Sequence, residues 1–267
     1  MKISCSVEIL TLNSGKTLRR CLESLKDFDD IMVIDGNSTD DTASIAKEYG
    51  ARIFPQSDAP AYNIKIEDFS AVRNIGVREA RHKWFLYIDS DEYISAEAVR
   101  EIRDIVSAGD ANRHFVYKIP RKCIVGGEVI ERSSVYPNYQ MRFFYLPATD
   151  GFIKKLHERI SVKKGYEAGV LRNPEYVPFD EIAVLKKKWR NYARTQYRGV
   201  RVSVGSFLLS AVNDLVQFFK YLVKYALTFV SGSGKRMPFA YEWYNAYYHI
   251  WLIQEAFGAF RHNRNDK

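Results

Sequence analysis

The first 110 residues alternate between two hydrophobic patterns. Short apolar runs rich in β-branched residues, typical of buried strands, are separated by segments whose apolar positions recur every three or four residues, typical of amphipathic helices. The expected strands are 3–12, 30–35, 51–55 and 84–88, and the expected helices are 14–25, 41–49, 69–80 and 96–108. This alternation predicts a Rossmann-like α/β fold, in which helices cover both faces of a mostly parallel sheet.

The pattern changes twice along the rest of the chain. From 115 to about 178 it consists mainly of short strand-like pieces, which we expect to form antiparallel segments beside the main sheet. From 179 it becomes helical, with expected helices at 182–199, 206–230 and 239–260. We therefore predict an α/β domain over residues 1–180 and a basic, aromatic region of amphipathic helices over residues 181–267.

The positive charge of the protein is concentrated in this helical region. The net charge is +8, and residues 181–267 contain 14 Lys and Arg against 5 Asp and Glu, whereas residues 1–180 contain 26 against 27. Such a distribution predicts an anionic partner, either lipid headgroups or nucleic acid. We expect no nucleic acid, because the basic residues are interleaved with large apolar faces and not with a groove for stacking bases.

The segment 206–230 is long enough to cross a bilayer. It carries a polar stripe of Asn213, Gln217, Lys220 and Lys224, and a lysine near the bilayer centre costs roughly 2.5–3.5 kcal/mol on insertion scales. We therefore expect a helix that lies in the plane of an anionic membrane surface, with its lysines at the headgroups. The alternative is a helix that packs against the α/β domain or against a second subunit in a homo-oligomer.

The cysteines and the first residues bear on the compartment. Cys5, Cys21 and Cys123 are widely spaced and match no metal or disulfide pattern, which favours a reducing cytoplasm. The first residues run directly into a strand, so we expect no signal peptide. Together with the basic helices, these features predict a cytoplasmic protein held peripherally on the inner face of the cytoplasmic membrane.

Polar residues follow three of the expected parallel strands. Thr11 and Asn13 follow the first, Asp35 ends the second, and Asp89 and Asp91 follow the strand at 84–88. Ligands of such sheets bind beyond the carboxyl ends of the strands. Carboxylates two residues apart on an extended segment point the same way and favour Mg²⁺ or Mn²⁺, which keep open positions for substrate phosphates. The alternative is an acidic turn that only caps the following helix.

Four motifs, in this order, resemble the family-2 inverting glycosyltransferases with the A-type nucleotide-sugar fold. They are Thr-Leu-Asn at 11–13, Val-Ile-Asp-Gly-Asn-Ser-Thr-Asp-Asp-Thr at 33–42, Ala-Val-Arg-Asn-Ile-Gly at 71–76 and Asp-Ser-Asp-Glu at 89–92. The later segments at 136–144 and 156–158 are similar to those of the bacterial subgroup that adds β-linked glucose to the lipopolysaccharide inner core. The second motif departs from the family in having one carboxylate where two are usual, and Leu-Arg-Asn-Pro at 171–174 replaces a stretch in which the subgroup has a further histidine.

The resemblance implies a role for each residue of these motifs. Nucleotide-sugar binding is implied for Thr11, Asn13, Asp35, Arg73, Asn74, Asp89 and Ser90. Asp91 is the expected direct metal ligand, with Asp89 on the ribose or a metal-bound water and His157 as a third metal or diphosphate contact. Glu92 is expected to order the loop. Inversion needs a base that deprotonates the acceptor hydroxyl, and Glu158 is the candidate base.

These observations predict a metal-dependent inverting hexosyltransferase. It is expected to move glucose from a nucleotide sugar, a UDP-sugar, to a hydroxyl of a lipid-linked glycan such as lipopolysaccharide core. A polyprenyl-phosphate hexose synthase is the alternative enzyme, and its phosphate acceptor would need no base such as Glu158. A non-catalytic nucleic-acid-binding protein is the alternative from another class.

Overall fold

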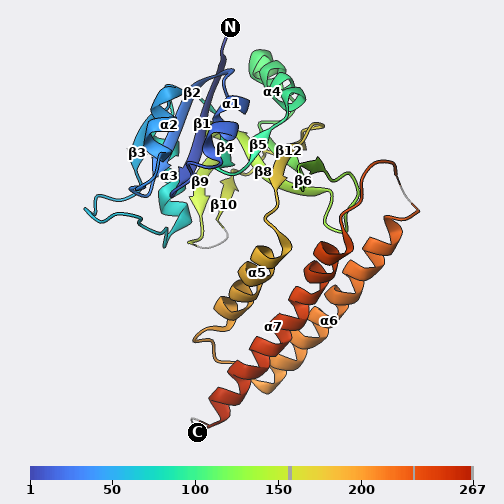
Figure 1. Ribbon diagram of the computed structural model, residues 1–267. Helices are drawn as coiled ribbons and strands as arrows, with labels where there is room; N and C mark the ends of the chain where they lie inside the picture. Colours follow the sequence, from blue (N-terminus) through green and yellow to red (C-terminus); the bar gives the residue numbers. More distant parts are fainter. Residues whose placement is uncertain (156–157, 231, 266–267) are drawn as a thin grey trace. The chain divides into compact units, whose positions relative to one another are not determined.

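The computed structural model describes residues 1–155, 158–230 and 232–265, in two compact units (Figure 1). The first unit comprises residues 1–122 and 137–177, and the second comprises residues 123–136 and 178–267. The sequence predicts a boundary near residue 180. It does not predict that the internal segment 123–136 groups with the C-terminal helices, because the composition of this segment gives no sign of it.

The first unit is built on a sheet whose parallel strands lie in the order β3, β2, β1 and β4. Their bounds are β1 Ile3–Thr11, β2 Phe28–Asp35, β3 Arg52–Pro55 and β4 Trp84–Asp89. Thr11 pairs with Asp35, and the adjacent Leu10 pairs with Asp89. The carboxyl ends of these three strands are therefore level, which brings their polar residues to one edge of the sheet.

The sheet continues from β4 through antiparallel strands. These are β8 Asn138–Tyr145, β6 Val116–Val125, β12 Glu175–Pro178 and β5 Tyr93–Ile94. The short β7 Glu128–Val129 pairs antiparallel with β6, and β11 Ala168–Val170 pairs parallel with it. A separate antiparallel pair, β9 Thr149–Ile153 and β10 Arg159–Val162, follows β8. The expected antiparallel segments beside the parallel sheet are confirmed.

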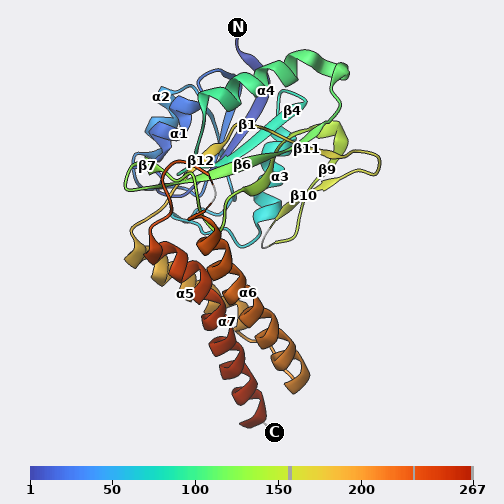
Figure 2. The ribbon, with the colours of Figure 1, turned by 90° about the vertical axis from the view of Figure 1, so that its right-hand side faces the viewer.

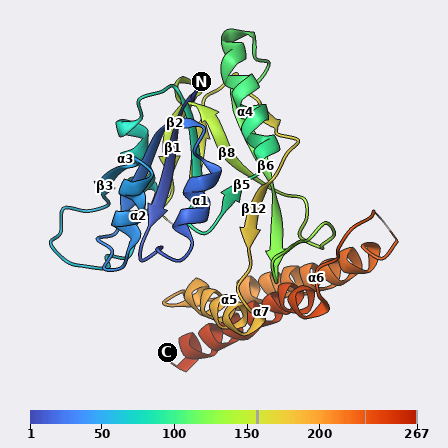
Figure 3. The same ribbon diagram turned by 45° about the horizontal axis from the view of Figure 1, so that its top comes forward.

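Helices cover both faces of the sheet in this unit (Figure 3). Helices α1 Leu18–Ser24, α2 Thr42–Glu48 and α4 Ala96–Ala108 bury apolar residues in the core on one face, where alternate positions of β1 point. Helix α3 Phe69–Glu79 packs on the other face through Val72, against Leu10 and Ile34. Single turns of 3-10 helix occur at Gly109–Ala111 and Leu146–Ala148. The predicted α/β fold is thus confirmed.

In its described part, the second unit contains helices α5 Ile182–Tyr197, α6 Val204–Leu227 and α7 Phe239–Asn265. Helices α6 and α7 run side by side in opposite directions, as Figure 2 shows. Aromatic contacts join them along their length, from Phe207 with Phe260 at one end to Phe218 with Trp243 nearer the other. The expected C-terminal helices are therefore present.

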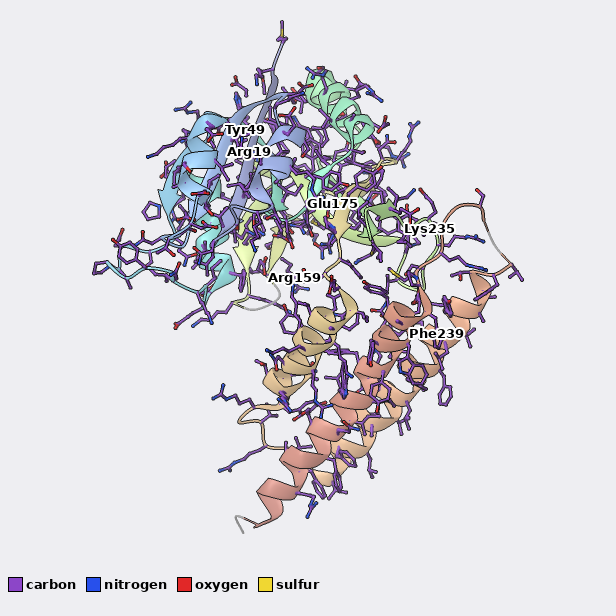
Figure 4. The ribbon with its side chains drawn as sticks, in the orientation of Figure 1. Arg19, Tyr49, Arg159, Glu175, Lys235 and Phe239 are labelled. Carbon is purple, nitrogen blue, oxygen red and sulfur yellow. The ribbon has the colours of Figure 1, made fainter. Side chains whose placement is uncertain are left out.

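The segment 123–136 binds the connection that links α6 to α7. The Arg132 guanidinium donates hydrogen bonds to the carbonyls of Thr228, Gly232 and Gly234, and the buried Glu242 at the start of α7 accepts from Ser134. Figure 4 shows Lys235 in this connection and Phe239 at the beginning of α7. In the part of the chain that the structure describes, no helix combines the length and the apolar character needed to cross a membrane.

Candidate active site

The ends of β1 and β2 are tied together through Asp35. Its Oδ1 accepts hydrogen bonds from Thr11 Oγ1 at 2.7 Å and from Ser38 Oγ at 2.6 Å, and its Oδ2 accepts from the Ser38 backbone N–H at 2.7 Å. Ser38 Oγ in turn accepts from the Asn13 N–H at 2.8 Å. An ionised carboxylate has about four lone-pair positions. Three bonds therefore leave Asp35 Oδ2 able to accept one more.

Asn13 is held in a left-handed conformation after β1, with φ at +52°. Asparagine tolerates this conformation better than most residues because its side chain can bond locally. Its Oδ1 accepts from the Thr39 N–H at 3.0 Å, and its Nδ2 donates to Asn63 Oδ1 at 2.8 Å. The amide thus connects the loops after β1 and β2 to the segment before α3, and it fixes the shape of this edge.

The acidic motif does not continue as an extended strand. β4 ends at Asp89, and Ser90 and Asp91 form a turn closed by the Glu92 N–H bonding the Asp89 carbonyl at 3.0 Å. The expectation that Asp89 and Asp91 point the same way from an extended segment is therefore wrong. Asp91 is exposed, the Asp89 side chain is 40% exposed, and Glu92 is buried. Ser90 Oγ lies 2.8 Å from Ser14 Oγ, which joins this turn to the loop after β1.

Asp89 belongs to a group of charged side chains that we call the carboxylate–arginine cluster. Four carboxylates and three guanidiniums are connected by ion pairs: Glu8, Asp89, Glu92 and Glu175 with Arg73, Arg121 and Arg142. All except Asp89 have side chains no more than 14% exposed. Buried charges are stable only when paired. With all seven groups ionised, one negative charge of the cluster has no counterpart.

Arg73 occupies one side of this cluster. Its Nη1 donates to Glu8 Oε2 at 3.3 Å, its Nη2 donates to Asp89 Oδ1 at 2.6 Å, and its guanidinium lies 4.6 Å from the centre of the Tyr87 ring. Glu8 reaches it from the middle of β1, next to α3. A Cβ at Gly76 would lie only 2.4 Å from Glu8 Oε1, so a larger residue at this position of the helix would displace the Glu8 side chain.

Arg142 and Arg121 occupy the other side. Arg142 Nη2 donates to Asp89 Oδ2 and to Glu92 Oε2, both at 2.9 Å, and its Nε lies 3.5 Å from Glu175 Oε1. Arg121 also contacts Glu92, and its Nε lies 2.9 Å from Glu175 Oε1. Glu175 projects from β12 (Figure 4). Both oxygens of Asp89 therefore accept a charge-assisted hydrogen bond, which fixes the end of β4.

The pKa values reflect this arrangement. Burial raises the pKa of Glu8 to about 8 against the pull of Arg73, and burial raises the pKa of Glu92 to about 8. Burial also raises the pKa of Glu175. Burial alone would raise the pKa of Asp89 too, but Arg142 and Arg73 hold it below its usual range. The cluster therefore keeps Asp89 ionised while a proton resides among the more deeply buried carboxylates.

Glu158, the candidate base, lies next to Arg73. Its Oε1 is 3.7 Å from Arg73 Nε, and its side chain is 18% exposed. Asn74, the neighbour of Arg73, bonds the backbone of Phe152 in β9 in both directions, at 2.9 Å each. Helix α3 thus positions one end of the β9–β10 pair whose return strand begins just after Glu158. His157 lies outside the described residues.

Some of these side chains can act as ligands of a divalent cation. Within residues 1–155, 158–230 and 232–265, no three acidic, histidine or cysteine side chains come together as a ligand set. Asp91 offers an exposed carboxylate, and Asp89 offers lone pairs beyond those that its arginines occupy. Mg²⁺ and Mn²⁺ sites in phosphate-binding enzymes need only one or two carboxylates, because substrate phosphates complete them. The residues present fit such an ion.

Three members of the cluster were not anticipated as functional from the sequence. Glu8 sits within the expected strand 3–12, whereas Arg121 and Glu175 sit in the region from 115 to about 178, for which the sequence predicts only short strand-like pieces. Glu8 did carry a signal, because a carboxylate in the middle of a buried apolar run requires a partner. The identity of that partner, 65 residues away, could not be read from the pattern.

A protein-family match covers much of the chain. The model of the family described as Glycosyl transferase family 2 matches residues 6–172. The SPbeta prophage-derived glycosyltransferase SunS of Bacillus subtilis is 31% identical over 161 residues, which are 58% of this chain and 34% of SunS. An uncharacterized glycosyltransferase of Rickettsia felis is 31% identical over 115 residues, 43% of this chain and 38% of that protein. The chain thus spans little more than a third of the length of these relatives.

Two solved structures align with this chain at low sequence identity. TarS 1-349 of S. aureus in complex with UDP is 16% identical and aligns over 100% of this chain and 92% of its own, with a TM-score of 0.48. Glucosyl-3-phosphoglycerate synthase of Mycobacterium tuberculosis, in complex with Mn²⁺, UDP and glucosyl-3-phosphoglycerate, is 20% identical over 47% of this chain and 45% of its own, with a TM-score of 0.35.

Proposed function

Because this chain belongs to glycosyl transferase family 2, we propose that it is a metal-dependent inverting enzyme that moves a hexose, glucose, from a nucleotide sugar to a hydroxyl of a lipid-linked glycan. The observation that carries the proposal is the position of Arg73, whose guanidinium contacts both Asp89 and Glu158. The carboxylate at the donor end and the candidate base thereby lie against neighbouring nitrogens of one planar group.

The donor would bind at the edge formed by β1, β2 and β4. The free lone pair of Asp35 is suited to accept an N–H of a uracil base, and Thr11 and Asn13 hold the loops around it. Ser90 joins the β4 turn to the same edge, so that the diphosphate would lie near Asp89. Asp35 is already ordered by three hydrogen bonds, so binding the base would require little rearrangement.

Mg²⁺ or Mn²⁺ would be held by Asp91, with Asp89 beside it and His157 as the third contact that the sequence predicts. The ion would supply positive charge to the leaving nucleoside diphosphate. Arg73 and Arg142 keep Asp89 ionised and its carboxylate in one orientation.

On the acceptor side, Glu158 would take the proton of the attacking hydroxyl. Its contact with Arg73 orients the carboxylate, and its partial exposure leaves it reachable by a substrate. The lipid-linked acceptor, such as lipopolysaccharide core, follows from the resemblance of segments 136–144 and 156–158. We place the enzyme peripherally on the inner face of the cytoplasmic membrane, where such an acceptor would be made.

The donor is tested by thermal shift with UDP-, GDP- and dTDP-sugars, each with and without Mn²⁺. A donor present at 100 times its Kd should stabilise the fold by about 2.7 kcal/mol. Stabilisation by UDP-glucose that depends on Mn²⁺ is expected. If none of these nucleotide sugars stabilises the protein, the proposed donor is wrong.

The assignment of Glu158 as the base is tested by Glu158→Gln. The assay measures the rate of sugar transfer to a lipid-linked glycan, corrected for hydrolysis of the donor. Turnover should fall roughly 10²–10⁴-fold, the usual contribution of a general base, while the Kd for the donor stays the same. Glu167→Gln, an exposed carboxylate in the same half of the unit, is the matched control. Unchanged turnover in Glu158→Gln would contradict the assignment and favour a phosphate acceptor, which needs no base.

A further inference from the structure

The outer face of α6 is a continuous row of exposed apolar side chains. Leu208, Val212, Val216, Phe219, Val223 and Leu227 follow one another at intervals of three or four, and each is between 56% and 60% exposed. The aromatic side chains on a different face of the helix contact α7 instead. Large exposed apolar patches mark surfaces that bind other molecules.

The charges around this face favour a lipid surface over a second copy of the chain. The only acidic residue of α6, Asp214, is buried and bonded to His249, while Lys220 and Lys224 on the adjacent stripe are exposed. A symmetric dimer brings the same patch of each subunit together. It would set these lysines near their own copies without an acidic residue of α6 to neutralise them. Anionic headgroups supply the missing negative charge.

A cavity of about 890 Å³ lies in the same unit, where α5 ends and α6 is about to begin. Its lining includes Arg194, Arg198 and Arg201, with Gly258 and Ala259 of α7 leaving room opposite. Arg194 is 3.5 Å from Glu255, the one carboxylate among the described residues of the lining. Three guanidiniums against one carboxylate suit a phosphate group, which arginine binds through paired hydrogen bonds.

We propose that the second unit docks on an anionic phospholipid surface, with a headgroup phosphate in the arginine cavity and the outer face of α6 among the acyl chains. Arg201 is only three residues from the first residue of α6, so the two features adjoin along the chain. The whole unit carries 15 Lys and Arg against 8 Asp and Glu. The inference rests on the proposed function only for the membrane location of the acceptor, and it assigns the surface that holds the enzyme there.

The test is cosedimentation of the full chain with vesicles of phosphatidylcholine alone or mixed with phosphatidylglycerol, at low salt. The chain should sediment with the mixed vesicles and not with the neutral ones. Val216→Glu with Phe219→Glu should abolish sedimentation, because two charges would have to enter the acyl region. Asn213→Glu with Gln217→Glu adds the same charge on the polar stripe of the same helix and should retain most of it.

The cavity is tested by Arg198→Gln with Arg201→Gln. Removing two basic groups that each contribute about fivefold near an anionic surface should weaken binding about twenty-five-fold. Arg78→Gln with Lys83→Gln removes the same charge from exposed positions of the first unit and should weaken it much less. Circular dichroism and donor thermal shift on every variant separate this inference from the proposed function, because donor binding should persist in all of them.

Three results would overturn the inference. The first is full-length protein that stays in the supernatant with anionic vesicles, or that sediments equally with neutral ones. The second is a stable dimer in sedimentation velocity that Val216→Glu with Phe219→Glu dissociates, since the face would then join two copies. The third is tight binding of inorganic phosphate that requires Arg198 and Arg201 while vesicle binding does not, since the cavity would then serve a free anion.

Discussion

Glu8→Gln should remove a pH dependence from the stability of the fold. Glu8 is completely buried in β1, and its pKa is raised to about 8 by burial. An unfolded chain has an ordinary glutamate with a pKa near 4.5. Between these two pH values the folded state holds a proton that the unfolded state has lost, so the free energy of unfolding falls as the pH rises.

The magnitude follows from the width of that interval. Each pH unit between about 4.5 and 8 removes about 1.4 kcal/mol from the free energy of unfolding, and the effect ends above the folded-state pKa. From pH 6 to pH 9 the wild-type protein should therefore lose about 2.7 kcal/mol through Glu8 alone. The glutamine side chain has nearly the same shape and no charge to bury, so the variant should lack this loss. The pKa of Glu92 is also raised to about 8, so a residual pH dependence from Glu92 should remain in the variant.

Urea denaturation of both proteins at several pH values between 6 and 9 measures the effect. The variant should gain about 2.7 kcal/mol relative to the wild type across this range, with unchanged m-values. Glu48→Gln replaces an exposed carboxylate and should give a curve parallel to the wild type. Parallel curves for Glu8→Gln as well would refute the view that a buried proton on Glu8 balances the cluster.

Two further substitutions test other parts of the site. Asp91→Asn should abolish transfer and weaken Mn²⁺-dependent donor binding in a thermal-shift assay. The urea denaturation midpoint should stay unchanged because the side chain is exposed. Near-normal turnover would contradict the metal assignment. Gly76→Ala should lower the free energy of unfolding, measured in urea, by about 1–3 kcal/mol, because the new methyl group would collide with Glu8. This loss is expected even though alanine is favoured over glycine by about 1 kcal/mol within a helix. Gly205→Ala, in open space within α6, should be neutral or stabilising, and equal effects at both positions would argue against the collision.

The sequence was sufficient to predict the order of elements in the first unit. Strands such as Trp84–Asp89 and helices such as Ala96–Ala108 carry strong periodic patterns, and a Ser N-cap precedes the latter. The convergence of Thr11, Asp35 and Asp89 at one edge followed from the rule for parallel sheets, and their pairing in register agrees with it.

Other features depend on contacts that a local pattern does not contain. The turn after Asp89 is closed by the hydrogen bond from the Glu92 N–H to the Asp89 carbonyl, and two arginines bind the Asp89 carboxylate. The extended geometry expected for Asp91 is therefore not observed. Arg142 lies in a segment of the sequence that gives no sign of burial, yet its side chain is 2% exposed and pairs with three carboxylates. Polar periodicity in a strand does not distinguish a solvated arginine from one that neutralises a buried cluster.

The carboxylate–arginine cluster also constrains the order in which the chain can fold during synthesis. The ribosome releases Glu92 before either of its partners, Arg121 and Arg142, and it releases Glu175 last. A buried carboxylate without its partner costs about 3–5 kcal/mol, a large part of the stability of a typical domain. A nascent chain that ends near residue 115 should therefore be digested by protease as if unfolded, and one that extends past 177 should resist. The parallel strands are made first, and the cluster predicts that they become stable only after β12 has been synthesised.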